Sequence, residues 1–456
     1  MGTDGKAAWS TQDGREEVSK TDLLKERAEG QGTRPAQTER PQREGEGRSP
    51  PHETAGQREQ KPNPISRLRW EGRKIPSLMP FVFDLRTLAE AWEEVRRNNG
   101  VPGVDGESVE EFAEHAIERL WELSEAVRTH EWRPKPLKRV WIPKPDGTKR
   151  GLAVPCVVDR VVHRAAAKVL YEVFQDVFGP DCYAYVKDRS ALDAIQRIQR
   201  EGQTGKRWVF ETDLARFFDT IPQGRLIDKL AERIADGSFL KLVRLILRSG
   251  VLGEETLEKD AVGVPQGSPL SPILANIYLA AFDREIGSRY TLVRYADDVV
   301  VMCATKEEAE GAQREIEAVL KKEGLKLKPE KTSVVPLARG IEFLGYLLTE
   351  WKARPSAKSV KRFQEKVRSL TMRHETRPMK EVIQRVMPVV RGWSQYFRLS
   401  GKSPILWHLG EWLLSRLQSY QTKSRRVKLW KRDAPTSMLY EMGLRLPYHI
   451  VTSFKF

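Results

Sequence analysis

Cysteine is scarce in this chain of 456 residues: Cys156, Cys182 and Cys303 are the only three. They lie far apart and form no Cys-x-x-Cys pair, so the sequence predicts neither a zinc module nor a disulfide framework. This usage is typical of a protein kept in a reducing cytosol. Long apolar runs are also missing, since none reaches the roughly 18–20 residues that cross a bilayer. The polar N-terminus, with charges of both signs, does not resemble a secretory signal peptide.

Apolar clusters are almost absent from residues 1–62. This segment carries 11 Lys and Arg and 12 Asp and Glu, and it is rich in Gln, Gly and Pro. Such a segment buries too little apolar surface to offset the entropy of ordering. We therefore expect residues 1–62 to be disordered and folded structure to begin near Pro80.

Acidic residues are few in the last 105 residues. From Lys352 to Phe456 there are 23 Lys and Arg against 6 Asp and Glu, a net charge of +17, whereas the whole chain carries +15. A one-sided basic excess favours a polyanionic partner such as nucleic acid. Aromatic residues lie among these charges, and they fit either a helical core or a nucleic-acid surface: Trp393, Tyr396, Phe397, Trp407, Trp412, Tyr420 and Trp430.

The order of apolar patterns predicts an α+β core followed by a helical region. Strands are expected at 140–143, 151–154 and 207–214. Helices are expected at 85–97, at 159–177, at 191–199, over 225–250 and at 306–323, with a further one ending near His130. Beyond Ser356 the pattern is almost wholly helical.

The run Arg294-Tyr295-Ala296-Asp297-Asp298 lies between two segments rich in β-branched residues, which predicts a hairpin with two carboxylates at its turn. Adjacent carboxylates repel each other but suit a divalent cation. Asp213, at the end of the strand expected at 207–214, supplies a third. Carboxylates from two strand ends are what Mg²⁺-assisted phosphoryl transfer needs. A lone Asp is more often a turn former or a helix cap, and that reading would be preferred for Asp213 alone.

A glycine- and proline-rich run, Gly263-Val264-Pro265-Gln266-Gly267-Ser268-Pro269, precedes a helix expected to begin near Ser271. A loop of this composition lets its backbone approach a ligand closely. The start of the following helix can support a nucleotide or a template base. An ordinary helix-entry loop remains the alternative for any single residue of the run.

In this order, these segments resemble the reverse transcriptases encoded by bacterial group II introns, from about residue 85 to 430. The resemblance implies an α+β right-hand polymerase fold. It implies fingers with an N-terminal extension at 80–205, a palm with an antiparallel sheet at 206–350 and an α-helical thumb, or maturase domain, at 356–430. Residues 431–456 would form a short basic extension.

The resemblance also assigns roles to single residues. Asp213, Asp297 and Asp298 are implied to be catalytic, and with Leu214 to bind two Mg²⁺ ions. Lys144, Arg150, Phe218, Gln266 and Lys331 are implied to contact the nucleotide. Asn99, Gly100, Arg391, Trp393 and Tyr396 are implied to bind RNA. Without the resemblance, Phe218 fits a core position equally well, and Lys144 with Arg150 fits a solvated hairpin.

Some residues depart from the pattern usual in that family. Ser268 follows Pro-Gln-Gly where a second glycine is usual, Gln223 stands where a His is frequent, and the run from Asp181 to Ser190 is atypical. These departures resemble group II-like reverse transcriptases found outside introns, including some used in antiviral defence. No zinc-binding endonuclease is expected after the thumb, because the tail lacks the length and the cysteines.

The resemblance thus implies an RNA-directed DNA polymerase that uses dNTPs and two Mg²⁺ ions and binds an RNA template and the RNA–DNA hybrid. It further implies a role in intron RNA binding, splicing and mobility, in a bacterial cytoplasm with association to the nucleoid when on DNA. No membrane partner is expected, and a homodimer is left open. Two alternatives remain: a domesticated enzyme of host or antiviral defence, and a non-catalytic RNA-binding splicing factor, which the intact Asp213, Asp297 and Asp298 disfavour.

Overall fold

The computed structural model describes residues 64–143, 149–253, 257–258, 263–372, 374–423 and 435–454. The disorder expected for residues 1–62 falls outside this range. The described residues form two compact units. Unit 1 holds residues up to Val173 together with the stretches of 230–261 and 265–271, and unit 2 holds residues 174–229, 262–264 and 272 onward. The limits of fingers, palm and thumb remain predictions.

Folded structure begins upstream of Pro80, contrary to the sequence-based expectation. A short 3-10 helix, η2 (Pro64–Arg67), comes first, and Ile75 forms a parallel bridge with Ile234. Ile65, Leu68 and Leu78 are buried. These isolated apolar residues show no periodicity along the chain, so only their packing against distant elements reveals that they are part of the fold.

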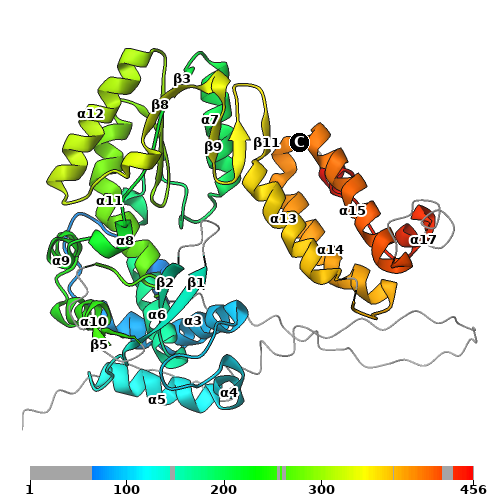
Figure 1. The fold of residues 1–456 in the computed structure, drawn as a ribbon. Helices are drawn as coiled ribbons and strands as arrows, with labels where there is room; N and C mark the ends of the chain where they lie inside the picture. Colours follow the sequence, from blue (N-terminus) through cyan, green and yellow to red (C-terminus); the bar gives the residue numbers. More distant parts are fainter. Residues whose placement is uncertain are drawn as a thin grey trace, which may run out of the picture. The chain divides into compact units, whose positions relative to one another are not determined.

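Unit 1 consists of helices around a small sheet (Figure 1). Its β2–β1–β4–β5 sheet pairs β1 antiparallel with β2 and parallel with β4. The strands expected at 140–143 and 151–154 are thus confirmed as one hairpin, each strand longer than expected. The elements of this part, including the four strands of the sheet, are α2 (Met79–Phe83), α3 (Leu85–Asn98), α4 (Val109–Glu114), α5 (Ala116–Arg128), β1 (Leu137–Pro143), β2 (Lys149–Val154), α6 (Val157–Phe174), α10 (Gly237–Leu247), β4 (Val251–Leu252) and β5 (Leu257–Glu258).

The helical stretch expected over 225–250 consists of two helices, α9 (Gln223–Ala231) and α10, with a break between them. Asp236 begins α10 as its N-cap and accepts a hydrogen bond from the backbone N–H of Phe239 at 3.0 Å. The same carboxylate accepts from the backbone N–H groups of Leu78 (2.7 Å) and Met79 (3.0 Å). Because the Asp236 carboxylate both caps α10 and satisfies backbone N–H groups of a distant segment, it favours the break over a continuous helix.

Unit 2 is built on a four-stranded antiparallel sheet in the order β6–β7–β3–β8. α12 packs on β3, β7 and β8, whereas α7 lies on the opposite side of the sheet (Figure 1). The elements of this part are η3 (Gln175–Val177), α7 (Ala191–Gln203), β3 (Trp208–Asp213), α8 (Phe217–Thr220), α11 (Ser271–Gly287), β6 (Thr291–Tyr295), β7 (Asp298–Cys303), α12 (Lys306–Lys322), η4 (Pro329–Lys331), β8 (Ser333–Pro336) and η5 (Leu337–Arg339).

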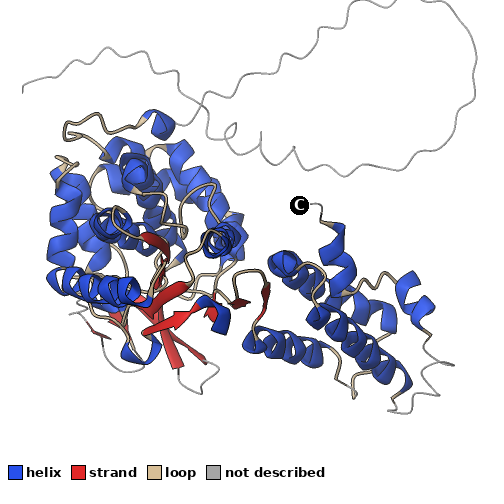
Figure 2. Ribbon diagram, turned by 90° about the horizontal axis from the view of Figure 1, so that it is seen from above, coloured by secondary structure: helices blue, strands red, loops and turns tan. Residues whose placement is uncertain are grey.

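A second antiparallel sheet, β11–β10–β9, leads into the helices that end the chain. The helical region expected beyond Ser356 is confirmed for the residues that the structure describes there, which form helices and no strand (Figure 2). The elements are β9 (Ile341–Phe343), β10 (Tyr346–Leu348), β11 (Ala353–Pro355), α13 (Ala357–Leu370), α14 (Met379–Tyr396), η6 (Phe397–Ser400), α15 (Pro404–Thr422), α17 (Thr436–Glu441) and α18 (Pro447–Ser453).

The helices from α13 to α18 share one apolar core. Val386 and Val390 of α14 and Leu413 of α15 are fully buried there. Leu439 of α17 and Val451 of α18 are also buried, so the described part of residues 435–454 is folded against the preceding helices. Across the described residues, no helix is both long enough and apolar enough to cross a membrane.

Candidate active site

The two carboxylate-bearing segments lie on neighbouring strands of the unit 2 sheet. β6 and β7 form a hairpin in which Tyr295 pairs with Asp298, so Ala296 and Asp297 are the two turn residues. β3 lies on the other side of β7, and the register places Asp213 directly opposite Asp298. Directly opposed residues of an antiparallel pair face the same side, with Cβ atoms about 4.5–5.5 Å apart. The sheet therefore brings together two carboxylates that are distant in sequence.

Burial and proximity shift the acidity of this pair in opposite directions. Burial, followed by the hydrogen bond to Asp213 and the charges of Asp213 and Asp297, raises the pKa of Asp298 to about 8. Burial also acts to raise the pKa of Asp213, but the hydrogen bond from Asp298 and the Lys331 ammonium hold that pKa below its usual value. Lys331, at the end of η4, forms an ion pair with Asp213. The pair thus retains one shared proton near neutral pH.

The donor chemistry of these residues fits a divalent cation. Carboxylate oxygens are the hard donors that Mg²⁺ prefers. The three neighbouring carboxyl groups share a proton and attract the Lys331 ammonium, which shows that they carry negative charge that a cation could neutralise. Leu214 lies beside them and donates its backbone N–H to the Asp297 carbonyl at 3.1 Å. Among the described residues, however, no three Asp, Glu, His or Cys side chains already converge as metal ligands. The shared proton and Lys331 are the groups with which a cation would compete.

A buried arginine holds the turn that carries Asp297 and Asp298. The Arg294 side chain is fully buried, and its guanidinium binds both carboxylate oxygens of Asp283 on α11, at 2.6 and 2.5 Å. Its Nη1 donates to the Ala296 carbonyl at 3.0 Å and to Asn276 Oδ1 at 3.2 Å. Ala296 has φ of +58°, a left-handed conformation that costs an L-residue about 1–2 kcal/mol. The Arg294 network stabilises this backbone in its unfavourable state.

Phe218 lies on α8, shortly after Asp213, and is partly buried against Phe217, with the ring centroids 5.3 Å apart. Its carbonyl accepts a hydrogen bond from the Val264 backbone N–H at 2.7 Å. A Cβ on Gly263 would come within 2.3 Å of the Phe218 carbonyl oxygen, so only glycine fits there. Gln223 Nε2 donates to the Gly263 carbonyl at 2.8 Å. Gln223, which departs from the family pattern, thus helps to hold the Gly263–Val264 segment beside the unit 2 site.

Two of the expected nucleotide contacts, Arg150 and Gln266, meet in unit 1. Arg150 Nε donates to Gln266 Oε1 at 3.1 Å, and the Ala153 backbone N–H donates to the Gln266 carbonyl at 2.7 Å. Gly267 has φ of +125°, and a Cβ there would lie 2.5 Å from the Ala153 carbonyl oxygen. The close backbone approach expected of this loop is therefore made to strand β2. Lys144 lies outside the described residues.

Ser268, the second departure from the family pattern, has a structural role. Its side chain is buried, its Oγ lies 3.0 Å from His163 Nδ1, and it accepts from the Leu270 backbone N–H at 3.2 Å. Burial lowers the pKa of His163 to about 3, so this imidazole is neutral. A glycine in place of Ser268 would leave a buried nitrogen of His163 without this partner.

The expected RNA-binding loop follows α3, where Asn99 adopts a left-handed conformation (φ +38°) as the C-cap. A Cβ on Gly100 would lie 2.9 Å from the Arg160 guanidinium. Arg160 donates to the Val101 carbonyl and, at 2.9 Å, to the Pro155 carbonyl. The buried Arg160 side chain therefore pins this loop to the start of α6, while Asn99 stays exposed.

The expected RNA-binding aromatics of α14 lie in an aromatic cluster. The Trp393 ring centroid is 4.8 Å from that of Phe363 and 4.5 Å from that of Phe397. Tyr396 donates its hydroxyl to the Leu344 carbonyl at 2.8 Å. These contacts join α14 to α13 and to the β9–β10 turn. The alternative that Trp393 and Tyr396 pack in a helical core is therefore partly correct.

Trp393 and Tyr396 also line a cavity of about 560 Å³ together with Arg362 and Lys366 of α13. The indole Nε1 of Trp393 is buried and has no hydrogen-bond partner among the described residues. We call this cavity, with Arg362, Lys366, Trp393 and Tyr396 in its wall, the thumb groove. Arg391, on the same helix, is exposed and does not line it.

Sequence reasoning missed Arg294, Arg160 and the two α13 cations. Arg294 stands in an apolar strand, and Asn276 and Asp283 are seven residues apart on one face of α11. That spacing is a signal for a buried charged network, but it cannot show which helix faces the strand. Arg362 and Lys366 are four apart on a helix, a spacing that any solvated helical face also shows.

The chain matches two family profiles. Residues 142–348 match the profile described as reverse transcriptase (RNA-dependent DNA polymerase), and residues 360–436 match the group II intron, maturase-specific domain. The first match covers the β6–β7–β3–β8 sheet, and the second runs from within α13 through α15. The expected α+β right-hand polymerase fold is confirmed by these matches together with the observed elements.

Curated relatives include proteins named for group II introns. Protein YkfC of Escherichia coli is 29% identical over 325 residues, which are 62% of this chain and 85% of that protein. The group II intron-encoded protein LtrA of Lactococcus lactis is 29% identical over 197 residues, or 42% of this chain and 32% of that protein. The putative COX1/OXI3 intron 1 protein of Saccharomyces cerevisiae is 35% identical over 165 residues, or 36% of this chain and 20% of that protein. The chain thus spans a third or less of the length of the last two relatives.

Solved structures resemble the chain only distantly. A telomerase from Candida albicans in complex with a fragment of telomeric RNA has a TM-score of 0.39 and 13% identity, covering 72% of this chain and 71% of that one. A partial Cas6-RT-Cas1–Cas2 complex has a TM-score of 0.33 and 23% identity over 54% of this chain and 41% of that one.

Proposed function

We propose, because the chain belongs to the group II intron family of reverse transcriptases and maturases, that it copies RNA into DNA at Asp213, Asp297 and Asp298. RNA-directed DNA polymerase activity follows from the reverse-transcriptase domain. The observation that supports the assignment of these residues is the register that sets Asp213 opposite Asp298, with Asp297 in the adjoining turn. Such a triad of carboxylates is not needed for RNA binding alone.

In the proposed reaction, the 3′ hydroxyl of a primer loses its proton to water and its oxygen bonds to the α-phosphorus of a dNTP, while the bond from that phosphorus to the bridging oxygen breaks and pyrophosphate leaves. Two Mg²⁺ ions, when bound, would lower the pKa of the 3′ hydroxyl and neutralise charge on the phosphates. Asp213, Asp297 and Asp298, with Leu214 beside them, would hold these ions. Asp298 would release the proton that it shares with Asp213, and Lys331 would turn its ammonium from Asp213 toward a phosphate. The Arg294 network keeps the turn in place, so little reorganisation is needed.

We propose the nucleotide contacts that the sequence predicts, residue by residue. Arg150, already oriented by Gln266, supplies a guanidinium that suits a triphosphate, and Lys144 is proposed to act with it. Phe218, close in sequence to Asp213, is proposed to exclude the ribose 2′ hydroxyl of an incoming nucleotide. Its partly exposed ring is compatible with that role.

The thumb groove is proposed to hold the RNA–DNA hybrid and, in the maturase role, intron RNA. Its cations can contact phosphates, and its aromatic rings offer faces for ribose or bases. Arg391, and Asn99 with Gly100 in unit 1, are proposed as further RNA contacts. Roles in the splicing and mobility of a group II intron are proposed on the strength of the family; a domesticated role in defence is the alternative, favoured by Ser268 and Gln223. We further propose a cytoplasmic location, with nucleoid association on DNA, and leave a homodimer to be measured.

Primer extension on a generic RNA template with dNTPs and Mg²⁺ tests the polymerase proposal. Asp297→Ala with Asp298→Ala should lower the extension rate by at least about 10²–10³-fold, the scale of one lost transition-state contact, while RNA affinity stays near that of the wild type. Asp228→Ala, on an exposed position of α9, is the matched control and should extend normally. Extension retained in the double variant would refute the assignment of these residues.

A further inference from the structure

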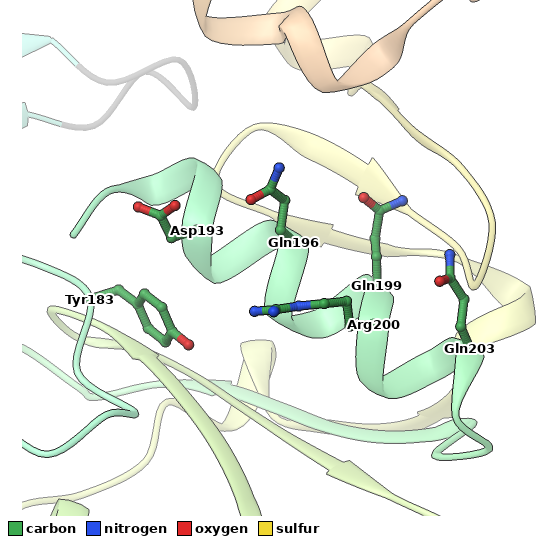
Figure 3. A pocket seen from close by; sticks show the side chains of 6 residues that line it. All are labelled: Tyr183, Asp193, Gln196, Gln199, Arg200 and Gln203. Atoms are coloured by element: carbon green, nitrogen blue, oxygen red, sulfur yellow. The ribbon is translucent and has the colours of Figure 1, made fainter. Parts of the chain in front are cut away.

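One side of α7 forms a polar groove that the proposed reaction does not use. The helix buries Leu192, Ile195 and Ile198 in the core of unit 2. Its other side carries residues at the i, i+3, i+4 and i+7 spacing of a single helical face. They line a cavity of about 520 Å³, shown in Figure 3, whose walls are Tyr183, Asp193, Gln196, Gln199, Arg200 and Gln203. We call this cavity the α7 groove.

A buried tyrosine forms part of the lining. Tyr183 is only 9% exposed, yet Figure 3 shows its hydroxyl turned toward the side of α7 that carries Arg200. That hydroxyl makes no hydrogen bond within the described part of the chain. Burial raises the pKa of Tyr183 above its ordinary value, so the group remains a neutral donor and acceptor. A polar atom in the wall of a cavity, without a protein partner, is open to a ligand.

The remaining polar groups are also available. Gln196, Gln199 and Arg200 form no side-chain hydrogen bond or ion pair with the described residues, whereas Asp193 accepts from Ser190 in a capping box. The neighbouring cations Arg197 and Lys206 are both paired with Glu201, at 3.1 and 2.9 Å. The groove therefore offers amide donors and acceptors, the guanidinium of Arg200, and the carboxylate of Asp193, whose charge the neutral Ser190 donors do not balance.

An exposed tryptophan adjoins the end of the groove. Gln203 Nε2 donates to the Glu350 carbonyl at 3.3 Å, and Arg207 pairs with the Glu350 carboxylate at 3.5 Å. The next residue, Trp351, is 67% exposed in the turn between β10 and β11. The Thr349 backbone N–H donates to the Lys352 carbonyl at 2.9 Å, which closes the turn. The indole is thus displayed on a fixed turn rather than on a loose loop.

We propose that the α7 groove binds unpaired nucleotides of a folded RNA. A base would stack on Trp351, and ribose hydroxyls or base edges would bond to Gln196, Gln199 and the Tyr183 hydroxyl. Arg200 would contact a phosphate. The inference rests on the proposed function, in which RNA is a substrate of this chain.

The chemistry of the lining favours RNA over other ligands. Amide side chains that both donate and accept match base edges and the 2′ hydroxyl, and single-stranded RNA presents unstacked bases to aromatic side chains. A protein partner would be expected to need an apolar centre, which the lining of this groove does not offer. The groove shares no residue with the proposed catalytic, nucleotide or thumb contacts, so its variants separate RNA docking from chemistry.

Photo-cross-linking identifies the occupant directly. The full chain is irradiated with RNA hairpins that carry 4-thiouridine in a randomised loop on a fixed stem, and cross-linked peptides are mapped by mass spectrometry. Cross-links are expected on peptides holding Tyr183, residues 191–203 and Trp351, and they should be lost with a fully paired RNA duplex. Cross-links confined to other regions, or equally strong with the matching DNA hairpin, would overturn the proposal.

Affinity for the same hairpin pool gives a second readout. Trp351→Ala should raise the Kd about tenfold, which corresponds to ~1.4 kcal/mol, within the ~1–3 kcal/mol seen per stacked base. Gln199→Glu should weaken binding similarly through repulsion of phosphate, while Gln313→Glu on α12 is the matched control and should not. Unchanged affinity in both groove variants, or an equal loss in the control, would contradict the proposal.

Primer extension on a short RNA template separates the two proposals when the template is supplied at saturating concentration and is paired to its primer except for the few nucleotides to be copied. The wild type and both groove variants should extend equally. If the wild type fails to extend, the proposed function fails, whereas the cross-links still decide what the groove binds. If the groove variants alone lose extension on that template, the groove serves chemistry and the docking role is wrong.

Discussion

Arg294 shows how a single buried charge can serve a site that it does not enter. A buried ion pair is costly unless its hydrogen bonds are complete, and here the guanidinium contacts Asp283, Asn276 and the Ala296 carbonyl. The last contact fixes the left-handed residue that precedes the two turn-side carboxylates. Arg294 is therefore a positioning residue, since it acts on Asp297 and Asp298 through the backbone.

Replacing Arg294 should reduce both stability and catalysis. Arg294→Ala leaves Asp283 buried without its counter-ion, so the free energy of unfolding should fall by about 3–5 kcal/mol. Arg294→Lys keeps the charge but loses the bidentate fork, and its kcat for primer extension should fall while the KM for dNTP stays close to the wild-type value. Denaturant titration and steady-state kinetics measure the two effects.

Arg289→Ala is the control for that series, because Arg289 forms exposed ion pairs with Glu285 and Glu315. Exposed pairs contribute about 0–1 kcal/mol, so this variant should unfold and extend almost as the wild type does. A stable Arg294→Lys enzyme with unchanged kcat would show that the turn keeps its shape without the fork.

At the scale of elements, the β9–β10 turn links the sheets of unit 2 to its helices. Leu344 and Gly345 both have positive φ, +48° and +79°, as the two-residue turn between Phe343 and Tyr346 requires. The Gly345 carbonyl accepts from the Ser356 backbone N–H (2.9 Å) and from the Ser359 hydroxyl (2.8 Å). The turn thereby fixes the start of α13, the helix whose cations line the thumb groove.

Charge reversal on α13 should weaken binding of an RNA–DNA hybrid. Arg362→Glu with Lys366→Glu replaces two groove cations that contact phosphate in our proposal, and the slope of log K against log salt should become shallower by about 2. Lys361→Glu lies on the same helix but does not line the groove, and it is the control. Fluorescence anisotropy with a labelled hybrid measures both. Equal losses in the control would show that only overall charge matters.

Periodicity predicted most elements but not where separate elements meet. The hairpin of Asp297 and Asp298 and the strand of Asp213 follow from local β-branched patterns. Their register does not, because an open sheet accepts several pairings until the core selects one. The break at Asp236 was missed for a similar reason: its partners Leu78 and Met79 are remote in sequence. The resemblance implies RNA contacts for Trp393 and Tyr396 and the sequence leaves a core position open for them, because helical spacing cannot tell a groove wall from a core.

At the scale of the whole molecule, charge is distributed unevenly along the chain. The net +17 of residues 352–456 exceeds the +15 of the whole chain, so the rest is slightly acidic. A basic region attached to a near-neutral polymerase core favours binding through counter-ion release at the phosphate backbone. This distribution was readable from composition, although composition could not show that residues 435–454 fold against α14 and α15.

RNA affinity of the intact chain should therefore depend steeply on salt. If the protein neutralises about 6–10 phosphates, the binding constant should fall by roughly 10³–10⁵-fold between about 50 and 200 mM salt. Filter binding at several salt concentrations measures the slope. A nearly flat response would contradict a surface that contacts phosphates, whatever its affinity at low salt.

The pairing of β3 with β7 has a consequence for synthesis of the protein itself. β3 ends at Asp213, but its neighbour β7 begins only at Asp298, after α11 and β6 have been made. The whole stretch between Asp213 and Asp298 must therefore leave the ribosome before the two carboxylates can meet. Under the proposed function, truncated translation products that stop earlier would therefore be unable to copy RNA, and a nascent chain could not begin copying the messenger that encodes it.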